Sequence, residues 1–195
     1  AKAKAKAKPA AKAAAKASLP VKEPLKELNV SVFTWNHAQC SPSKADCQFL
    51  LEHSDSSVIV VGVQEVEDLK PRRHEGSRSK ALKRVMLSTL GGEYAPVVMT
   101  SLGAIHLYVF VRKDAIPHLK RSSIVTWEVA CGIGNVVQNK GALGVRLTVA
   151  GKSLMFFTAH LAAHQSKIAE RNADFWRIMK ESEVALAAQL GGGGG

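Results

Sequence analysis

The sequence predicts an α/β protein built around β-sheet, and three observations support this prediction. Short runs rich in β-branched and aromatic residues recur along the chain, and turn residues or charges separate them. Two segments, residues 79–90 and 166–190, instead repeat apolar residues at helical spacing. The 195 residues are 46% hydrophobic, which is enough for one domain with a substantial core.

The first part of the chain alternates predicted strands and helices. LNVSVFTW (28–35) is a strand, and a short helix follows at about residues 44–52. SVIVVGV (57–63) is a continuous apolar run, which predicts a strand buried on both faces. The helix at 79–90 ends at two glycines, 91 and 92.

The second part is richer in strands. Gly and Pro separate three further strands, which are YAPVVMTS (94–101), GAIHLYVFVRK (103–113) and SSIVTWEVA (122–130). Two more, ALGVRLTVA (142–150) and SLMFFTA (153–159), flank Gly151 and predict a hairpin. The long helix at 166–190 then runs into five glycines, residues 191–195, which we interpret as a tail.

Residues 1–26 form a lysine- and alanine-rich segment that we predict to be disordered. It contains eight lysines against one acid, so it carries about seven of the eleven net positive charges. Such a segment favours anionic membrane surfaces, or nucleic acid as the weaker possibility. The alternative is a purely solubilising extension.

Cysteine usage and hydropathy indicate an intracellular protein that is soluble or peripherally attached to membrane. Cys40, Cys47 and Cys131 are odd in number and form no C-x-x-C pair, which argues for a reducing compartment. No apolar run approaches the roughly 18 residues needed to span a bilayer.

Polar residues follow two of the predicted strands at the points where the strands end. Asn36 comes after the first strand and Glu65 after the buried strand. Polar groups at strand ends of an open sheet converge on one crevice, and amide and carboxylate oxygens suit magnesium. We therefore interpret Asn36 and Glu65 as a hard-cation site; the alternative is that Asn36 caps a turn and Glu65 is solvated.

Two later segments bring groups suited to phosphate. The glycine- and asparagine-rich stretch 132–146 includes Lys140, and its backbone amides could cradle a phosphate, although it lacks the Walker spacing. His160 ends a strand and precedes His164 by four residues, but Leu161 occupies the position of the glutamate in H-E-x-x-H. A zinc protease is thus disfavoured, and His160 is a candidate catalytic or phosphate-contacting residue, the alternative being an ordinary structural histidine.

These stretches together resemble the inositol polyphosphate 5-phosphatases of the endonuclease/exonuclease/phosphatase superfamily. The resemblance covers roughly residues 27–180. The matching stretches, in order, are FTWN (33–36), VGVQE (61–65), GAIHLYVFVR (103–112), QNKGALGVR (138–146), TAHLAAH (158–164) and RNADF (171–175).

The resemblance implies a fold, a cofactor and roles for particular residues. The fold would be part of a four-layer α/β/β/α sandwich resembling deoxyribonuclease I, formed by residues 27–190. Mg²⁺ would be held with the help of Glu65 and Asn36, and His160 and Asn36 would be catalytic. The residues implied on the substrate side are Asn139, Lys140, Arg171 and Asn172. The reaction would be hydrolysis of the 5-phosphate of a phosphoinositide or inositol phosphate. The family also implies a cytoplasmic location, at membrane surfaces in part, while the composition of residues 1–26 gives the nucleus as the alternative.

The sequence also departs from this family, because the W-x-G-D-x-N-Y-R, P-x-W-C-D-R and S-D-H stretches of its second half do not occur. We therefore expect an enzyme-family chain with weak or no activity by itself, and an exposed sheet that favours self-association. Two alternatives remain. One is a nuclease of the same superfamily, which NKGA and HLAAH disfavour, and the other is a non-catalytic polyanion-binding protein with a vestigial phosphatase half-domain.

Overall fold

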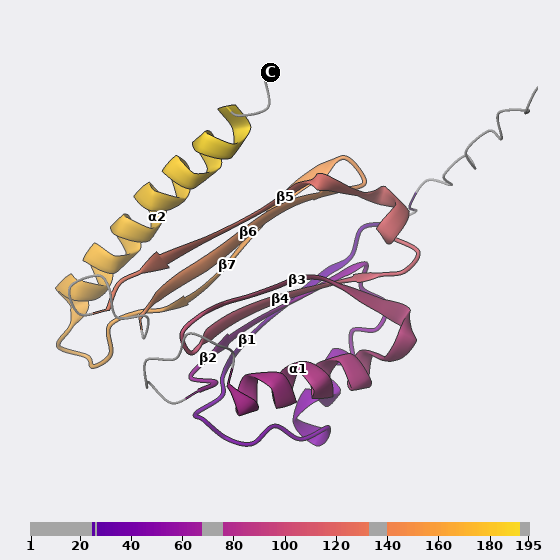
Figure 1. Cartoon of the computed structure of the whole chain (residues 1–195), viewed down its shortest axis with the longest axis horizontal. Helices are drawn as coiled ribbons and strands as arrows, with labels where there is room; N and C mark the ends of the chain where they lie inside the picture. The colour runs from indigo at the N-terminus through magenta and orange to yellow at the C-terminus, as the bar shows by residue number, and fades with distance from the viewer. Residues whose placement is uncertain (1–24, 26, 68–75, 133–139, 192–195) are drawn as a thin grey trace, which may run out of the picture.

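The chain folds into two stacked β-sheets with helices on both outer faces (Figure 1). The computed structural model describes residues 25, 27–67, 76–132 and 140–191. The predicted tails therefore lie outside the described residues, apart from Leu25 and Gly191. The α/β prediction is confirmed.

The first sheet has the strand order β1-β2-β4-β3. Its strands are β1 (Val30–Asn36), β2 (Val58–Gln64), β3 (Tyr94–Leu102) and β4 (Ile105–Arg112). β1 and β2 run parallel, whereas β4 is antiparallel to both of its neighbours. Every residue of β2 is buried, which confirms the prediction from its continuous apolar run.

The second sheet is an antiparallel meander in the order β5-β6-β7. Its strands are β5 (Leu119–Ala130), β6 (Gly141–Val149) and β7 (Lys152–His160). Ala150 and Gly151 both have positive φ, of 47° and 75°, and form the tight turn between β6 and β7. The predicted hairpin is therefore confirmed.

The helical segments are η1 (Ala45–Leu50), α1 (Ser77–Leu90), η2 (Gly91–Glu93), η3 (Ile116–His118) and α2 (Ile168–Gly191). The helix expected at 44–52 is a short 3-10 turn rather than an α-helix. α2 begins two residues later than predicted, because His164 takes a positive φ of 73° and a turn from His164 to Lys167 precedes the helix. None of the helices in the described ranges is long and apolar enough to cross a membrane.

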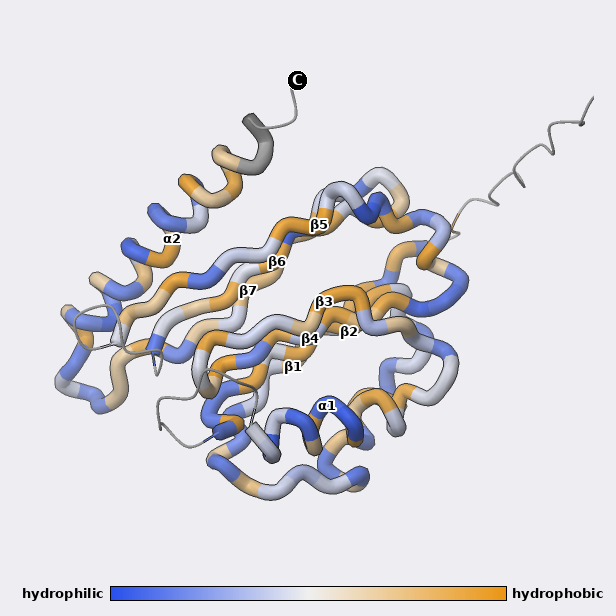
Figure 2. Tube along the Cα trace, viewed as in Figure 1, coloured by the Kyte–Doolittle hydropathy of each residue, from blue (hydrophilic) through white to orange (hydrophobic). Residues whose placement is uncertain are grey.

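Three apolar clusters separate the layers. The largest lies between the two sheets, a second lies beneath α1 and η1, and a third lies between α2 and the outer face of β5 and β6. Figure 2 shows the same arrangement, with hydrophobic segments along the strands and hydrophilic residues in the turns. Alternating side chains on two faces produce this layering.

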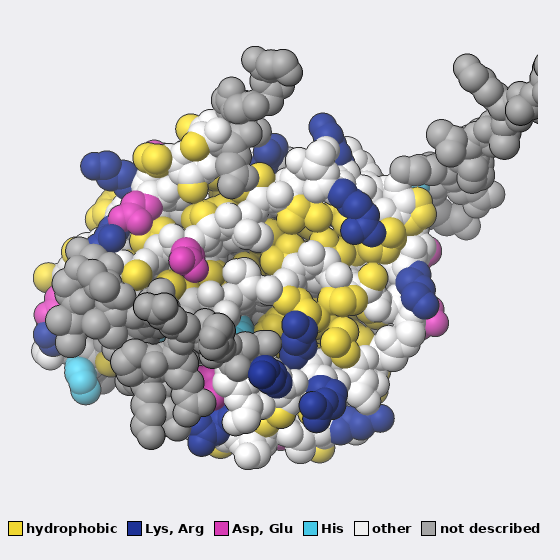
Figure 3. Space-filling view, in the orientation of Figure 1, with side chains coloured by type: hydrophobic (Ala, Val, Ile, Leu, Met, Phe, Trp, Pro, Cys, Tyr) yellow, Lys and Arg dark blue, Asp and Glu magenta, His cyan; other side chains and the backbone are white. Residues whose placement is uncertain are grey.

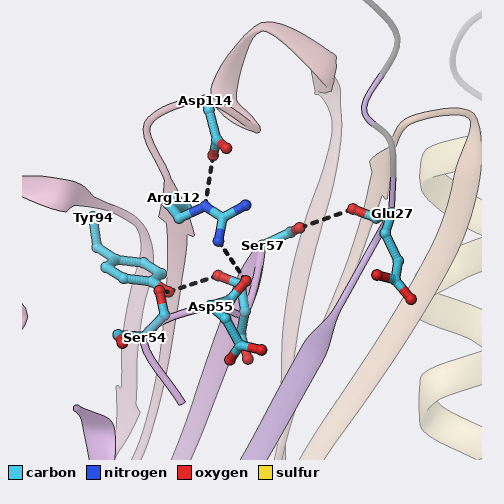
Figure 4. A network of polar contacts seen from close by, with 8 residues as sticks. Glu27, Ser54, Asp55, Ser57, Tyr94, Arg112 and Asp114 are labelled. Carbon is cyan, nitrogen blue, oxygen red and sulfur yellow. Dashed lines mark hydrogen bonds and ion pairs between the residues drawn. The ribbon is translucent and has the colours of Figure 1, made fainter. Parts of the chain in front are cut away.

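A network of polar contacts lies at the end of the first sheet where β2 begins (Figure 4). Arg112 donates to the Asp114 carboxylate at 2.8 Å and to the carbonyl of Asp55. Tyr94 Oη donates its single hydrogen to the carbonyl of Ser56 at 2.6 Å, and the carbonyl of Ser54 lies 3.0 Å from the same oxygen. The hydrogen bond that Asp114 accepts from Arg112 lowers the pKa of Asp114, so this carboxylate stays ionised. The opposite end of the sheet carries the residues predicted to be functional.

Candidate functional site

Four of the predicted residues meet where β1, β2 and β7 end. Asn36 is the last residue of β1, Glu65 directly follows β2, and His160 is the last residue of β7. Lys140 immediately precedes β6, whose first residue pairs with His160. Because β1 and β2 are parallel, their carboxyl ends lie at the same edge of the sheet.

The four side chains form a continuous series of polar contacts. Asn36 Nδ2 donates to Glu65 Oε1 at 3.0 Å. The same Oε1 lies 3.5 Å from His160 Nε2, which in turn lies 2.6 Å from Lys140 Nζ. An ammonium is only a donor, so Nε2 of His160 accepts this hydrogen bond as a neutral imidazole. The expected convergence of the strand ends is therefore present, while the catalytic and binding roles of these residues stay predictions.

The backbone at Glu65 is strained. Its φ is 56°, in the left-handed region that residues with a side chain seldom adopt. Two backbone hydrogen bonds hold it there, from Gln39 N to Glu65 O at 2.8 Å and from Val66 N to Ala104 O at 3.1 Å. Strain of this kind, of order 1–3 kcal/mol, persists where the surroundings hold it and is frequent at functional sites.

Gln64 links the strands that carry the site, and the sequence prediction did not identify this role. The buried Gln64 amide donates to Thr158 Oγ1 (2.9 Å) and Thr34 Oγ1 (3.3 Å), so it joins β2 to β7 and β1. A Cβ on Gly62 would lie 2.6 Å from the Thr158 hydroxyl, so the sheets approach closely only because residue 62 is glycine. The available signal was a glutamine placed directly after the continuous apolar run 57–63.

Burial and charge tune the two basic groups. Burial is the main cause that lowers the pKa of His160; the Lys140 ammonium lowers it further and the Glu65 carboxylate acts against both. Burial likewise lowers the pKa of Lys140, while Glu65 and Asp174 act to raise it. An anion entering here would meet a partly desolvated ammonium beside a neutral imidazole.

The residues present fit a magnesium ion that takes few protein ligands. Glu65 offers a partly exposed carboxylate, and Mg²⁺ is commonly held by one or two carboxylates together with water and substrate phosphates. Asn36 Oδ1 accepts from Ala38 N at 3.0 Å and its Nδ2 faces Glu65, so Asn36 orients the carboxylate here. Among the described residues, no group of three or more His, Cys, Asp or Glu is placed to hold a metal.

The other three predicted residues are not part of this cluster. Asn139 lies outside the described residues. The Arg171 guanidinium donates to three carbonyls of the segment after β7, those of Ala162 (3.2 Å), His164 (2.5 Å) and Gln165 (3.4 Å). It therefore anchors this segment to α2, and Asn172 is exposed on the same helix. Their substrate contacts stay predictions.

Comparison with known proteins places this geometry in a family. Residues 33–192 match the model of the endonuclease/exonuclease/phosphatase family 2. The chain belongs to this family. Similar curated proteins include type II inositol polyphosphate 5-phosphatase 15 of Arabidopsis thaliana, 31% identical over 150 residues, and synaptojanin of Caenorhabditis elegans, 28% identical over 141 residues. Each match covers 69% of this chain.

The match to these relatives is confined to one part of much longer proteins. The chain spans 13% of the Arabidopsis protein and 12% of the nematode synaptojanin. The match therefore does not establish the activity or the partners of those whole proteins for this family member.

Solved structures show the fold. The inositol polyphosphate 5-phosphatase domain of spsynaptojanin, in complex with inositol (1,4)-bisphosphate and calcium, superposes with a TM-score of 0.67 at 23% identity. The match covers 77% of this chain and 45% of that domain. A Cimex nitrophorin mutant superposes with a TM-score of 0.56 at 19% identity, covering 74% of this chain and 50% of the nitrophorin. The family member thus has part of the deoxyribonuclease I-like α/β/β/α sandwich.

Proposed function

We propose that the chain carries part of a magnesium-dependent phosphomonoesterase site that acts on the 5-phosphate of an inositol phosphate or phosphoinositide. The observation that carries the proposal is the contact series Glu65–His160–Lys140, which sets a metal-binding carboxylate beside two nitrogen groups suited to phosphate. Relatives named as inositol polyphosphate 5-phosphatases and synaptojanins support the substrate class. The inositol bisphosphate bound in the neighbouring structure supports it as well.

In this mechanism each residue has a separate task. Glu65 would hold Mg²⁺, oriented by Asn36, and the bound ion would supply charge neutralisation of the phosphoryl group. Lys140 would bind a phosphate oxygen in a partly desolvated setting, where its charge is worth more than in water. When phosphate draws Lys140 away, Nε2 of His160 becomes free to take a proton, and the imidazolium so formed could donate that proton to a phosphate oxygen.

The proposal includes weak or absent turnover by this chain alone. Glu65 is the sole carboxylate in the contact series formed by the described residues Asn36, Glu65, Lys140 and His160. The resemblance described above assigns further aspartates, an asparagine and a histidine to stretches absent from the sequence. We therefore expect this chain by itself to bind substrate and metal but to catalyse phosphate release weakly or not at all.

The test combines metal binding with phosphate release. Titration calorimetry with Mg²⁺ on the full chain should show binding that Glu65→Gln abolishes and that Glu93→Gln, an exposed change outside the site, leaves intact. Release of phosphate from a 5-phosphorylated phosphoinositide should be measured beside a His160→Ala variant. Release that needs both Mg²⁺ and His160 would show that this part suffices. Mg²⁺ binding that is unchanged in Glu65→Gln would contradict the proposed site.

A second candidate function is polyanion binding without catalysis, with anionic membrane as the first partner and a cytoplasmic location. α1 carries Arg78, Lys80, Lys83 and Arg84 and no acid. Figure 3 shows lysine and arginine side chains gathered over this helix. Basic groups near an anionic bilayer contribute about 1 kcal/mol each, and the lysine-rich N-terminal segment would add to this attraction.

Vesicle sedimentation would distinguish the two functions. Phosphatidylserine vesicles should retain the full chain at low salt and release it at high salt, and Lys80→Glu with Arg84→Glu should weaken retention. Salt-sensitive retention without Mg²⁺ binding or phosphate release would favour the non-catalytic function. Retention that is indifferent to salt would exclude it.

A further inference from the structure

The segment that follows His160 is held by α2. The last pair of β6 with β7 is Gly141 with His160, so the chain leaves the sheet directly after the candidate catalytic histidine. Leu161 packs against the apolar cluster between α2 and the second sheet, and His164, with its positive φ of 73°, begins the turn that leads into the helix. We refer to residues 161–167 as the β7–α2 segment. The direction of the backbone beyond His160 therefore depends on contacts with α2.

Two side chains of α2 hold the β7–α2 segment. Arg171 donates to three of its carbonyls, among them that of Ala162 at 3.2 Å. Asp174 Oδ2 accepts from Ala162 N at 3.2 Å. Residues three apart on a helix share a face, so Arg171 and Asp174 contact the segment from the same side. Ala162 is thus fixed at both its carbonyl and its amide, two residues after His160.

Asp174 is also close to the ends of the other two strands of the second sheet. Burial raises the pKa of the Cys131 thiol, directly after β5, to about 11, and the charge of Asp174 adds to this shift. Burial lowers the pKa of Lys140, directly before β6, while Glu65 and Asp174 act to raise it. Cys131 N donates to Lys140 O at 2.8 Å, so these two strand ends are themselves joined. One carboxylate of α2 therefore lies near the ends of β5, β6 and β7.

This position suggests a role for a residue that has none so far. Asp174 lies in the stretch RNADF (171–175), but the site residues implied by the resemblance do not include it. We propose that Asp174 is a positioning residue, which holds the backbone at His160 in place through the amide of Ala162. The end of a strand frays unless the residues beyond it are tied down, so this hydrogen bond keeps His160 against Lys140. The inference rests on the proposed function, in which His160 and Lys140 act on the phosphate group.

Two substitutions separate the hydrogen bond of Asp174 from its charge. Asp174→Asn keeps an oxygen that can accept from Ala162 N but loses the charge, whereas Asp174→Ala loses both. A negative charge near a phosphate site repels phosphate, so a role through charge alone predicts tighter phosphate binding in both variants. A role through the hydrogen bond predicts weaker binding in Asp174→Ala and not in Asp174→Asn.

The first measurement is the affinity of the full chain for a soluble inositol phosphate that carries a 5-phosphate, by titration calorimetry. Asp174→Ala should weaken this affinity by about fivefold, which corresponds to the loss of one hydrogen bond, and Asp174→Asn should bind at least as tightly as the wild type. The affinity for Mg²⁺ alone should be unchanged in both variants, because the backbone at Glu65 is held by Gln39 and Ala104 and not by α2.

The second measurement is the position of the His160 imidazole resonances at constant pH, assigned as those absent from His160→Ala. Asp174→Ala should move them, and Asp174→Asn should move them much less. Two variants of α2 are controls and should leave them in place. Glu170→Gln removes an exposed carboxylate one turn earlier, and Ile178→Val weakens the packing of α2 on the second sheet.

The resonances are recorded without ligand, so they test the positioning role separately from the proposed function. Unmoved His160 resonances in Asp174→Ala, or an equal movement in Ile178→Val, would overturn the positioning role. Tighter binding of the inositol phosphate by Asp174→Ala would overturn it as well. A wild-type chain that binds neither Mg²⁺ nor the inositol phosphate would instead contradict the proposed function, and the resonances would still decide the role of Asp174.

Discussion

At the scale of single residues, a buried histidine outside the candidate site is tightly enclosed by polar partners. His106 on β4 lies 3.2 Å from Ser79 Oγ through Nε2 and 3.1 Å from Tyr108 Oη through Nδ1. Burial lowers its pKa to about 4, although the carboxylate of Glu67 acts in the opposite direction. The imidazole is therefore neutral in the folded protein at neutral pH, and Ser79 is too buried to act as a nucleophile.

His106 should make stability sensitive to mild acid. The unfolded chain binds a proton below the ordinary histidine pKa of 6.5, whereas the folded chain resists it until about pH 4. The stabilisation that comes from keeping His106 neutral is thus fully present above pH 6.5. As the pH falls towards 4, the free energy of unfolding decreases by about 3 kcal/mol in total. Urea unfolding between pH 7 and 4 should show this loss, and His106→Gln should lose less over the same window. Equal losses in the two proteins would contradict the assignment.

What could be predicted at this scale depended on where residues lie along strands. Asn36 and Glu65 were identified because each follows a strand, and the ends of parallel strands share an edge. The His106 contacts could not be identified in the same way. Ser79 is 27 residues away in sequence, and the two side chains meet only after α1 has docked on the sheet. The hydrogen bond from Ala38 N to Asn36 Oδ1, which sets the direction of the Asn36 amide, is the turn cap that the sequence allowed as the alternative for Asn36.

At the scale of elements, the start of α1 is fixed by a residue outside the helix. Glu67 Oε1 accepts from Ser79 N at 2.7 Å and from Ser79 Oγ at 2.8 Å. The N-cap residue is Gly76, which offers no side-chain cap, and a Cβ there would collide with the Glu67 carboxylate. The sequence indicated a helix from residue 79, two residues late, because its cap lies ten residues before Ser77 rather than in the first turn.

Removing the charge of Glu67 should loosen the first turn of α1. In Glu67→Gln the capping oxygen remains but its charge no longer complements the helix dipole, so we expect the free energy of unfolding to fall by about 1–2 kcal/mol. Glu93→Gln, at an exposed position, is the control and should change it by less than about 0.5 kcal/mol. Denaturant unfolding measures both. Faster amide exchange confined to the start of α1 would show that the loss is local, and an unchanged Glu67→Gln stability would refute the capping role.

At the scale of the whole molecule, the relation between the two sheets decides whether a site exists. Alternating and continuous apolar runs were sufficient to predict most strands and the hairpin at Gly151. They did not say how one sheet lies on the other, because stacking depends on contacts between residues far apart in sequence. Gln64 and Thr158 are 94 residues apart, yet their hydrogen bond brings the end of β7, and with it His160, to Glu65.

The close approach of the sheets at Gly62 gives a test of this dependence. A methyl group at residue 62 would press on the Thr158 hydroxyl and displace β7 from β2, so Gly62→Ala should lower the free energy of unfolding by about 1–3 kcal/mol. Gly92→Ala is a matched control, because a Cβ there meets only the end of the Lys113 side chain, at 3.7 Å. Thermal unfolding would report the stability of both variants. A selective change in the His160 imidazole resonance of Gly62→Ala would show that the site moves with β7, whereas equal stability of the two variants would mean that the sheets tolerate a wider separation.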